Sequence, residues 1–338
     1  MLKESSAPFH ESLETRVERF ISGDVGCALD VEHVRSLVGD ASNRAYYRLR
    51  LKNGESRVLA LYPSPFVPAE LPFINVSELF RAMPLRVPRI DHASGGEGIV
   101  LLEDLGDTLL QDVVAEATAE EKETLYRDAV ALLAALQIKG EELRSDRYLP
   151  FRIAFDETKF FDELDFFRAH FLCGLGGARL TPAELSQLNE IFRALAGSLA
   201  DQPYALCHRD YHSRNLMVVN DELVVIDFQD ARQGPRAYDL VSLMNDSYVS
   251  HEAELVSEMV EVLASALGAN LSGEYDLAAL QRNLKALGTF GFQIQQRKNE
   301  VYRRYLDHTL VLIRENLVRN ARWDRLRSIL ARHIEELA

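Results

Sequence analysis

Cysteine is scarce in this 338-residue sequence, and long apolar runs are absent from it. The three cysteines, Cys27, Cys173 and Cys207, are odd in number and far apart, and none belongs to a C-x-x-C pair. This pattern argues against a disulfide framework and against a zinc or redox motif, and it favours a reducing compartment. No stretch approaches the ~18 uninterrupted apolar residues of a membrane span, and the first residues contain no apolar signal-peptide core. We therefore expect a cytoplasmic protein with no membrane segment.

An excess of positive charge is also lacking. The sequence has 38 Lys and Arg against 52 Asp and Glu, which gives a formal net charge of −14 at pH 7. Such a balance opposes binding to phosphate backbones, so nucleic acid is not an expected partner. Hydrophobic residues make up 47% of the chain, which is enough for a sizeable core. The sequence does not indicate an oligomeric state.

The spacing of apolar residues changes near residue 106, and no internal repeat is present. Before this point a short amphipathic helix at 11–22 is followed by a strand pattern, in which Asn53-Gly54 between alternating runs predicts a hairpin. A helix opened by Pro68 is expected at 68–82. The predicted strands are 34–40, 43–51, 56–63, 88–94 and 98–105.

From Asp107 onward the spacing is helical. One exception is a hairpin that turns at Asn220-Asp221. The predicted helices include a segment around 125–136 and the ranges 155–172, 181–200, 237–267, 276–296 and 302–318.

The hairpin lies in the segment CHRDYHSRNLMVVNDELVVIDFQDA, residues 207–231. Asp210, Asn215 and Asp227 supply two carboxylates and one amide at the ends of buried runs. Oxygen ligands without a His or Cys cluster suit Mg²⁺, which otherwise prefers phosphates and water. Phosphoryl transfer needs this kind of rigid positioning and charge neutralisation. The spacing therefore predicts a metal–nucleotide site, although Asp210 and Asn215 taken singly could also cap turns.

These residues also carry a family resemblance. His208-Arg209-Asp210, Asn215 and Asp227-Phe228-Gln229 resemble the catalytic loop and metal motif of the protein-kinase-like superfamily. The resemblance implies that Asp210 orients and deprotonates an acceptor hydroxyl, while Asn215 and Asp227 hold Mg²⁺ on the phosphates of ATP. His208 would be a packed structural residue. The implied fold is bilobal α+β, with a small five-stranded antiparallel N-lobe (1–105) and a larger, mainly helical C-lobe (106–338).

A long activation segment, which protein kinases place after the metal motif, is missing here. Asp227 is followed closely by GPRAYDLVSL (234–243), which resembles the aminoglycoside and choline phosphotransferase family. In that family an aspartate such as Asp239 braces the catalytic loop. HRDYHSRNLM, VIDFQDA and QRNLKALGTF further resemble the bacterial anomeric sugar kinases that phosphorylate N-acetylmuramate and N-acetylglucosamine at C1 in cell-wall recycling. The resemblance covers about residues 38–315.

Two features of kinases are absent from the N-terminal part. The third strand lacks the lysine that usually contacts the α and β phosphates, because the only lysines before residue 110 are Lys3 and Lys52. The first loop has one glycine, Gly39, in place of a glycine-rich motif. We expect the loop residues Ser42, Asn43 and Arg44 to contact the phosphates, with Arg44 as first candidate to replace the lysine. A solvated Arg44 on a strand edge is the alternative.

The remaining predicted contacts lie on both sides of the catalytic segment. By resemblance, Glu103 and Leu105 contact the nucleotide through their main chain. His212 and Arg214 are expected in the acceptor pocket, whereas Arg209 and Arg232 are expected to pair with acids such as Asp230. Gln293 and Arg297, near several aromatic residues, are candidates for binding a sugar, although aromatic residues at helical spacing more often belong to a core.

The expected partners are therefore a nucleotide and a small-molecule acceptor, preferably the anomeric hydroxyl of an amino sugar. A cationic acceptor such as an aminoglycoside or choline is an alternative, and so is a non-catalytic nucleotide-binding protein that lacks the strand lysine. A protein kinase is a weaker alternative because the activation segment is missing. The sequence chooses neither the sugar nor ATP over GTP.

Overall fold

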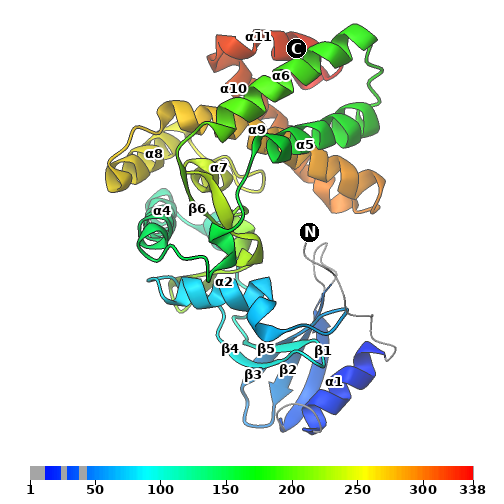
Figure 1. The fold of residues 1–338 in the computed structure, drawn as a ribbon, viewed down its shortest axis with the longest axis vertical. Helices are drawn as coiled ribbons and strands as arrows, with labels where there is room; N and C mark the ends of the chain where they lie inside the picture. The colour runs from blue at the N-terminus through cyan, green and yellow to red at the C-terminus, as the bar shows by residue number, and fades with distance from the viewer. Residues whose placement is uncertain (1–11, 24–28, 38–43, 338) are drawn as a thin grey trace.

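An antiparallel five-stranded sheet lies at one end of the computed structural model, and most of the rest is helical (Figure 1). The structure describes residues 12–23, 29–37 and 44–337. The order of the strands is β1-β2-β3-β5-β4. This arrangement confirms the expected kinase-like division into a small N-lobe and a larger helical C-lobe. The strands are β1 Val31–Leu37, β2 Ala45–Leu51, β3 Ser56–Leu61, β4 Ile90–Ser94 and β5 Ile99–Glu103.

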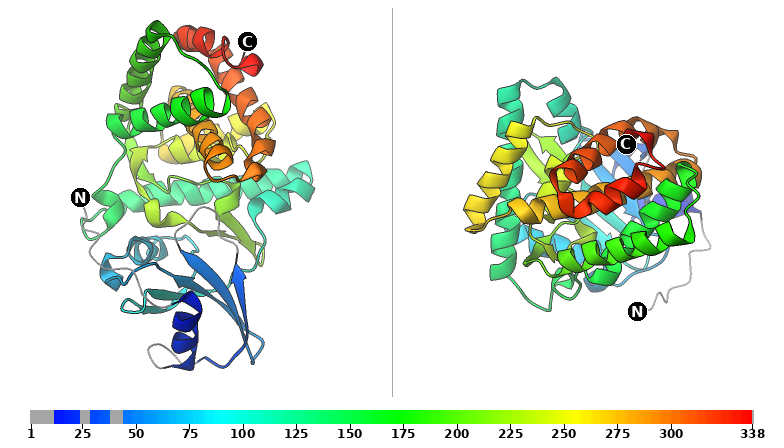
Figure 2. Two further views of the ribbon diagram at one scale, coloured as in Figure 1. Left: turned by 90° about the vertical axis from the view of Figure 1, so that its right-hand side faces the viewer. Right: turned by 90° about the horizontal axis from the view of Figure 1, so that it is seen from above.

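Each face of this sheet buries a different set of side chains, because successive residues of a strand point to opposite faces. On one face Leu59 and Leu101 pack with Phe20 of α1 (Leu13–Ser22), which lies against the sheet (Figure 2). On the other face Ala60 and Val100 join the main core of the protein. The second face therefore connects the N-lobe to the helical part.

Helix α2 (Pro72–Arg81) carries this connection. Its Phe73 and Phe80 contact Phe228, with ring centroids 4.9 and 5.4 Å apart, so the residue that follows Asp227 is held by the N-lobe. The predicted helix start at Pro68 is wrong, because Pro68–Glu70 form a separate 3₁₀ turn. Pro72 suits the first helical position, since that position needs no N–H partner, and it keeps the preceding Leu71 out of the helical region (ψ 118°).

The C-lobe contains nine α-helices within the described residues, together with a π-helix at Arg168–Leu175 that continues α5. No described helix is both long and apolar enough to cross a membrane. The helices are α3 Leu110–Glu116, α4 Ala119–Glu142, α5 Glu157–Phe167, α6 Pro182–Ala200, α7 Tyr238–Met244, α8 Ala253–Leu267, α9 Ser272–Gln295, α10 Leu306–Arg319 and α11 Asp324–Leu330.

The structure corrects three expectations for the C-lobe. The helix predicted at 237–267 is two helices, since Asp246 turns back to accept a hydrogen bond from the backbone N–H of Tyr248 (2.9 Å) and ends the helical run. A second strand pair, β6 (Tyr204–Cys207) with β9 (Arg232–Pro235), accompanies the predicted hairpin of β7 (Leu216–Val219) and β8 (Glu222–Val225). Helix α11 was not expected.

Helix α9 runs through the centre of the C-lobe and packs closely on its neighbours. A Cβ atom on Gly288 would lie 2.8 Å from the backbone nitrogen of Phe167, and one on Gly291 would clash with the carbonyl oxygen of His170. The two glycines therefore let α9 approach the backbone of α5 and the π-helix.

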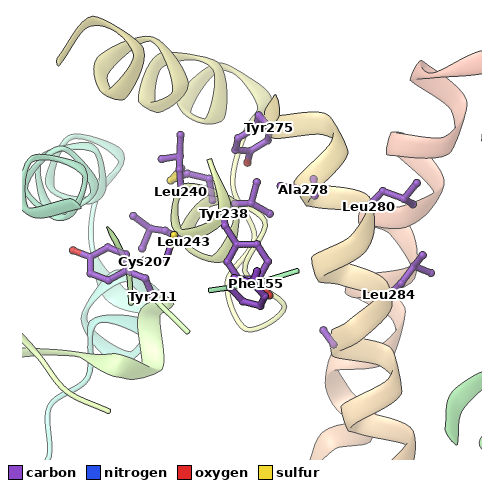
Figure 3. Close-up of a cluster of buried hydrophobic side chains, with 14 of the residues drawn as sticks. Phe155, Cys207, Tyr211, Tyr238, Leu240, Leu243, Tyr275, Ala278, Leu280 and Leu284 are labelled. Carbon is purple, nitrogen blue, oxygen red and sulfur yellow. The ribbon is translucent and has the colours of Figure 1, made fainter. Parts of the chain in front are cut away.

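A cluster of buried side chains packs α7 between α9 and the strands that support the catalytic loop (Figure 3). The aromatic rings of Tyr238 and Phe155 are 4.8 Å apart at its centre. The other labelled members are Cys207, Tyr211, Leu240, Leu243, Tyr275, Ala278, Leu280 and Leu284. This packing fixes α9 relative to the catalytic loop.

Candidate active site

One buried carboxylate hydrogen-bonds the backbone of the loop that follows β6. Asp239 of α7 accepts hydrogen bonds from the backbone N–H groups of His208 (2.5 Å) and Arg209 (2.9 Å). Arg209 has a positive φ of 86°, a conformation that a residue with a side chain adopts only when its surroundings impose it. Burial raises the pKa of Asp239 to about 6, although His208 and these two hydrogen bonds act to lower it. His208 is itself buried, and its ring nitrogen Nε2 bonds the carbonyl oxygen of Ile226 (2.9 Å).

The β7–β8 hairpin brings the amide and the second carboxylate to the same end of the loop. Asn220 and Asp221 both have positive φ, which gives the tight turn that the sequence predicted. At the open end of the hairpin, the N–H of Ile226 bonds the carbonyl oxygen of Asn215 (3.0 Å), so Asp227 follows directly beside Asn215. The Asn215 Nδ2 donates to the backbone carbonyl of Asp210 (2.9 Å). The three residues therefore belong to one connected unit.

Two cavities meet at this unit. The larger, with a volume of about 700 Å³, lies in the C-lobe and is lined by Asp210, Asn215 and Asp227. The smaller, of about 340 Å³, lies between the lobes and is also lined by Asn215 and Asp227, but not by Asp210. Groups bound in the two cavities would thus face one another across the Asn215–Asp227 pair. This arrangement suits transfer of a group between two bound molecules.

Asp210 is surrounded by cations. Its Oδ1 accepts hydrogen bonds from Arg282 (3.2 Å) and from the Lys285 Nζ (3.2 Å), and the Arg209 Nε lies 4.0 Å from Oδ2. Burial alone would raise the pKa of the Asp210 carboxyl, but Lys285, Arg282 and Arg209 together hold that pKa well below its ordinary value. The side chain keeps 28% exposure and reaches the larger cavity. An ionised, accessible carboxylate is what a proton acceptor requires.

Comparison with known proteins connects this geometry to a family. A model described as the phosphotransferase enzyme family matches residues 33–277. The chain belongs to this family. It is 31% identical over 262 residues to an N-acetylmuramate/N-acetylglucosamine kinase of Neisseria meningitidis. The matched region covers 74% of this chain and 75% of the relative. A protein of the same name from Pseudomonas aeruginosa is 32% identical over 263 residues, with 74% of each chain covered.

Solved structures share the fold. The aminoglycoside phosphotransferase APH(2'')-Ib bound to ADP superposes with a TM-score of 0.59 at 14% identity and covers 89% of this chain and 97% of its own. A choline/ethanolamine kinase family protein from Mesorhizobium loti gives a TM-score of 0.58 at 14% identity, with 90% and 94% covered. Membership of the phosphotransferase enzyme family makes the chain an enzyme, a small-molecule kinase that binds a nucleotide.

In this phosphotransferase the smaller cavity is lined by three of the five residues predicted to meet the nucleotide. Glu103 and Leu105 both line it. The Glu103 side chain accepts hydrogen bonds from Arg86 (3.2 Å) and from the backbone N–H of Arg89 (3.1 Å). The contact of its main chain with a nucleotide stays a prediction. Ser42 and Asn43 lie outside the described residues, whereas Arg44 lines the cavity.

Of the residues predicted to bind the acceptor, the structure places two in the larger cavity and two elsewhere. His212 and Arg214 line it, with the Arg214 guanidinium 4.8 Å from the ring centroid of Tyr248. Burial and the charge of Arg282 lower the pKa of His212 to about 3, so its ring is neutral. Gln293 is buried in α9 and Arg297 is exposed beyond it, and neither lines the cavity.

Arg282 and Lys285, which line the cavity from α9, were not among the residues predicted for the site. Both lie in QRNLKALGTF, one of the blocks that resemble the sugar kinases, and they are two cations three residues apart on a helix whose other residues are mostly apolar or small. By contrast, the expected ion pairs of Arg209 and Arg232 are present, because both approach Asp230, at 3.4 and 3.5 Å.

Proposed function

We propose that this phosphotransferase transfers the γ-phosphate of ATP to the anomeric C1 hydroxyl of N-acetylmuramate or N-acetylglucosamine. The observation that carries the proposal is the pair of cavities that share Asn215 and Asp227, with Asp210 in the larger one only. The relatives named above support the sugar.

The smaller cavity suits a nucleotide. Its walls include Val58, Leu102, Met217 and Ile226, which offer apolar surface to a flat base, and it opens toward Asn215 and Asp227. We propose that the adenine lies between these apolar side chains and that the phosphates extend toward the shared pair.

Asn215 and Asp227 fit Mg²⁺ as it is bound with nucleotides. The Asp227 side chain is 49% exposed, and the Asn215 amide nitrogen is used by Asp210, which leaves its oxygen for a ligand. Within the described residues no group of three or more His, Cys, Asp and Glu side chains is arranged to hold a metal. An ion here would therefore need phosphate and water oxygens to complete its coordination, as Mg²⁺ prefers. When bound, it would neutralise charge on the phosphates.

The larger cavity suits a sugar better than a cation. Its neutral polar lining, Ser242, Asn245, Asn283 and Thr289, offers donors and acceptors for hydroxyl and amide groups, and Phe290 and Tyr302 offer aromatic surface. Four cationic side chains line it against three carboxylates, which disfavours an aminoglycoside or choline. The low basicity of Asp210 matches an anomeric hydroxyl, because that hydroxyl is more acidic than an ordinary alcohol and gives up its proton to a weaker base.

The product of a sugar assay tests this function. The protein is incubated with ATP, Mg²⁺ and a panel of acceptors, and phosphorus NMR determines which carbon bears the phosphate. We expect phosphate at C1 of the two N-acetylated sugars and loss of turnover when Mg²⁺ is chelated. Turnover of cationic alcohols without turnover of N-acetylated sugars would disprove the proposed acceptor.

Arg44 is the cation that we propose in place of the missing strand lysine. Its guanidinium lies 3.8 Å from the Asp227 carboxylate and 5.7 Å from the ring centroids of Tyr46 and Tyr62. Arg48, the other cation lining the smaller cavity, is bonded to Asp104 (2.9 Å) and Asp107 (2.7 Å). Arg44 is thus the better placed of the two to meet phosphates held at Asp227.

Replacing Arg44 by methionine is expected to lower kcat/KM for ATP about 10- to 100-fold, because one charged contact to phosphate contributes roughly 1.5–3 kcal/mol. The loss should be larger than for Arg50→Met on β2, the strand that follows Arg44, where the side chain is 68% exposed. Steady-state kinetics at varied ATP provide the measurement. Equal kcat/KM values for the two variants would show that Arg44 does not contact the phosphates.

A further inference from the structure

Helix α9 brings two long cationic side chains into an otherwise enclosed part of the C-lobe. Arg282 and Lys285 lie one helical turn apart, and their side chains are only 11% and 12% exposed. The helix around them is largely buried and includes Leu284, Ala286 and Leu287. Burying two cations is costly unless negative charge compensates them.

The compensation visible in the protein is incomplete. Both cations donate to the same oxygen, Oδ1 of Asp210, at 3.2 Å each. Asp246, a further carboxylate of the cavity, is occupied by the backbone N–H groups of Ser213 (3.0 Å) and Tyr248 (2.9 Å). Two adjacent cations therefore share one carboxylate.

Glu163, the next acid nearby, accepts from Gln281 (2.9 Å) and lies 3.7 Å from Lys159 and 4.0 Å from Arg209. It attracts Arg282 and Lys285 from a distance but is shared with these direct partners. Burial and the neighbouring Arg282 lower the pKa of Lys285 despite the presence of Asp210. Tyr238 and Asp210 outweigh burial and raise the pKa of Arg282, so the shortage of negative charge falls on the ammonium group of Lys285.

The position of the two cations shows which substrate could supply the missing charge. They line the larger cavity and not the smaller one, so they lie on the acceptor side of the shared Asn215–Asp227 pair. Phosphates that enter from the smaller cavity reach that pair first. A permanent negative charge beside Arg282 and Lys285 would therefore belong to the acceptor.

We propose that Arg282 and Lys285 form an anion subsite that binds a carboxylate substituent of the acceptor sugar. This inference rests on the proposed function and refines it. A guanidinium and an ammonium from one helix face can hold a carboxylate by several hydrogen bonds while still orienting Asp210. The subsite favours N-acetylmuramate, which carries a carboxylate on its lactyl ether, over N-acetylglucosamine, which carries a hydroxyl there. It also opposes cationic acceptors.

The two sugars form a matched pair for the test, since they differ only in this substituent. The ratio of their kcat/KM values is measured for the wild type, Lys285→Gln and Lys285→Arg. Because Lys285 also contacts Asp210, both sugars are expected to react more slowly with Lys285→Gln, but the ratio isolates recognition of the carboxylate. We expect the ratio of N-acetylmuramate to N-acetylglucosamine to fall at least tenfold in Lys285→Gln and to stay within about threefold of the wild type in Lys285→Arg.

Lys139→Gln, a half-exposed lysine of α4, is the matched control and should leave the ratio unchanged. Binding of N-acetylmuramate without ATP, measured by calorimetry, should weaken in Lys285→Gln by a similar factor. A ratio in Lys285→Gln within twofold of the wild type would overturn the subsite and assign both cations to Asp210 or to the transferred phosphate. If the wild type phosphorylates neither sugar, the proposed function is wrong and the subsite is rejected with it.

Discussion

Replacement of Asp210 by asparagine is expected to lower kcat by about 10² to 10⁴ while nucleotide binding remains close to that of the wild type. The amide keeps the size of the side chain but cannot accept the acceptor's proton. Asp210 does not line the smaller cavity, so a nucleotide held there should be little affected. Turnover is measured with the preferred sugar, and nucleotide binding is measured separately by calorimetry.

The control for this change is Asp128→Asn, an exposed acid on α4, which should leave both quantities unchanged. The asparagine at position 210 also removes the carboxylate that Arg282 and Lys285 share, so a loss of stability is expected alongside the kinetic effect. Thermal melting separates the two effects. A variant that keeps more than a tenth of the wild-type kcat would show that Asp210 is not the proton acceptor.

The sequence predicted the position of Asn215 and Asp227 because the interactions that fix them are local. Eleven residues separate the two, and the Asn220-Asp221 turn with its pair of positive φ values sets the register of the hairpin between them. A tight two-residue turn has few alternatives, so the spacing alone places both residues at the open end. The same locality made the N-lobe hairpins predictable.

The contacts of α9 could not be predicted in this way. Arg282 and Lys285 are 72 and 75 residues from Asp210 along the chain, and they meet it because α9 packs on α5 and the π-helix through Gly288 and Gly291. Sequence spacing does not encode such tertiary packing. The prediction chose Gln293 and Arg297 instead, because their aromatic neighbours resemble a sugar site, but neither residue lines the cavity.

The strand pair of β6 and β9 was missed for another reason. Each strand has only four residues, and β9 contains Gly234 and Pro235, which are uncommon within strands. Their pairing depends on the surrounding core, where a Cβ at Gly234 would come within 2.6 Å of the Phe155 ring. A small residue is therefore needed at position 234 for packing. Strand propensity alone does not reveal this requirement, so the strand was not predicted.

Asp239→Ala is expected to lower the free energy of unfolding by about 2–4 kcal/mol and to reduce kcat as well. The alanine removes the acceptor of two buried N–H groups, those of His208 and Arg209, and an unpaired buried donor costs roughly 1–3 kcal/mol. Part of this cost is offset, because the alanine variant no longer buries a carboxylate. Burial of that group is unfavourable, since it raises the pKa of Asp239 to about 6.

Without that carboxylate, the backbone of His208 and Arg209 loses the hydrogen bonds that oppose the strain of the positive φ at Arg209, and the adjacent Asp210 becomes less firmly positioned. Asp239→Asn, which keeps one acceptor oxygen, should fall between the wild type and the alanine variant in stability. Urea denaturation and kcat are measured at a temperature at which all three proteins are folded. An alanine variant within about 0.5 kcal/mol of the wild type and with unchanged kcat would mean that the catalytic loop keeps its shape without Asp239, and that contacts such as those of Asn215 and the α9 cations are enough to position Asp210.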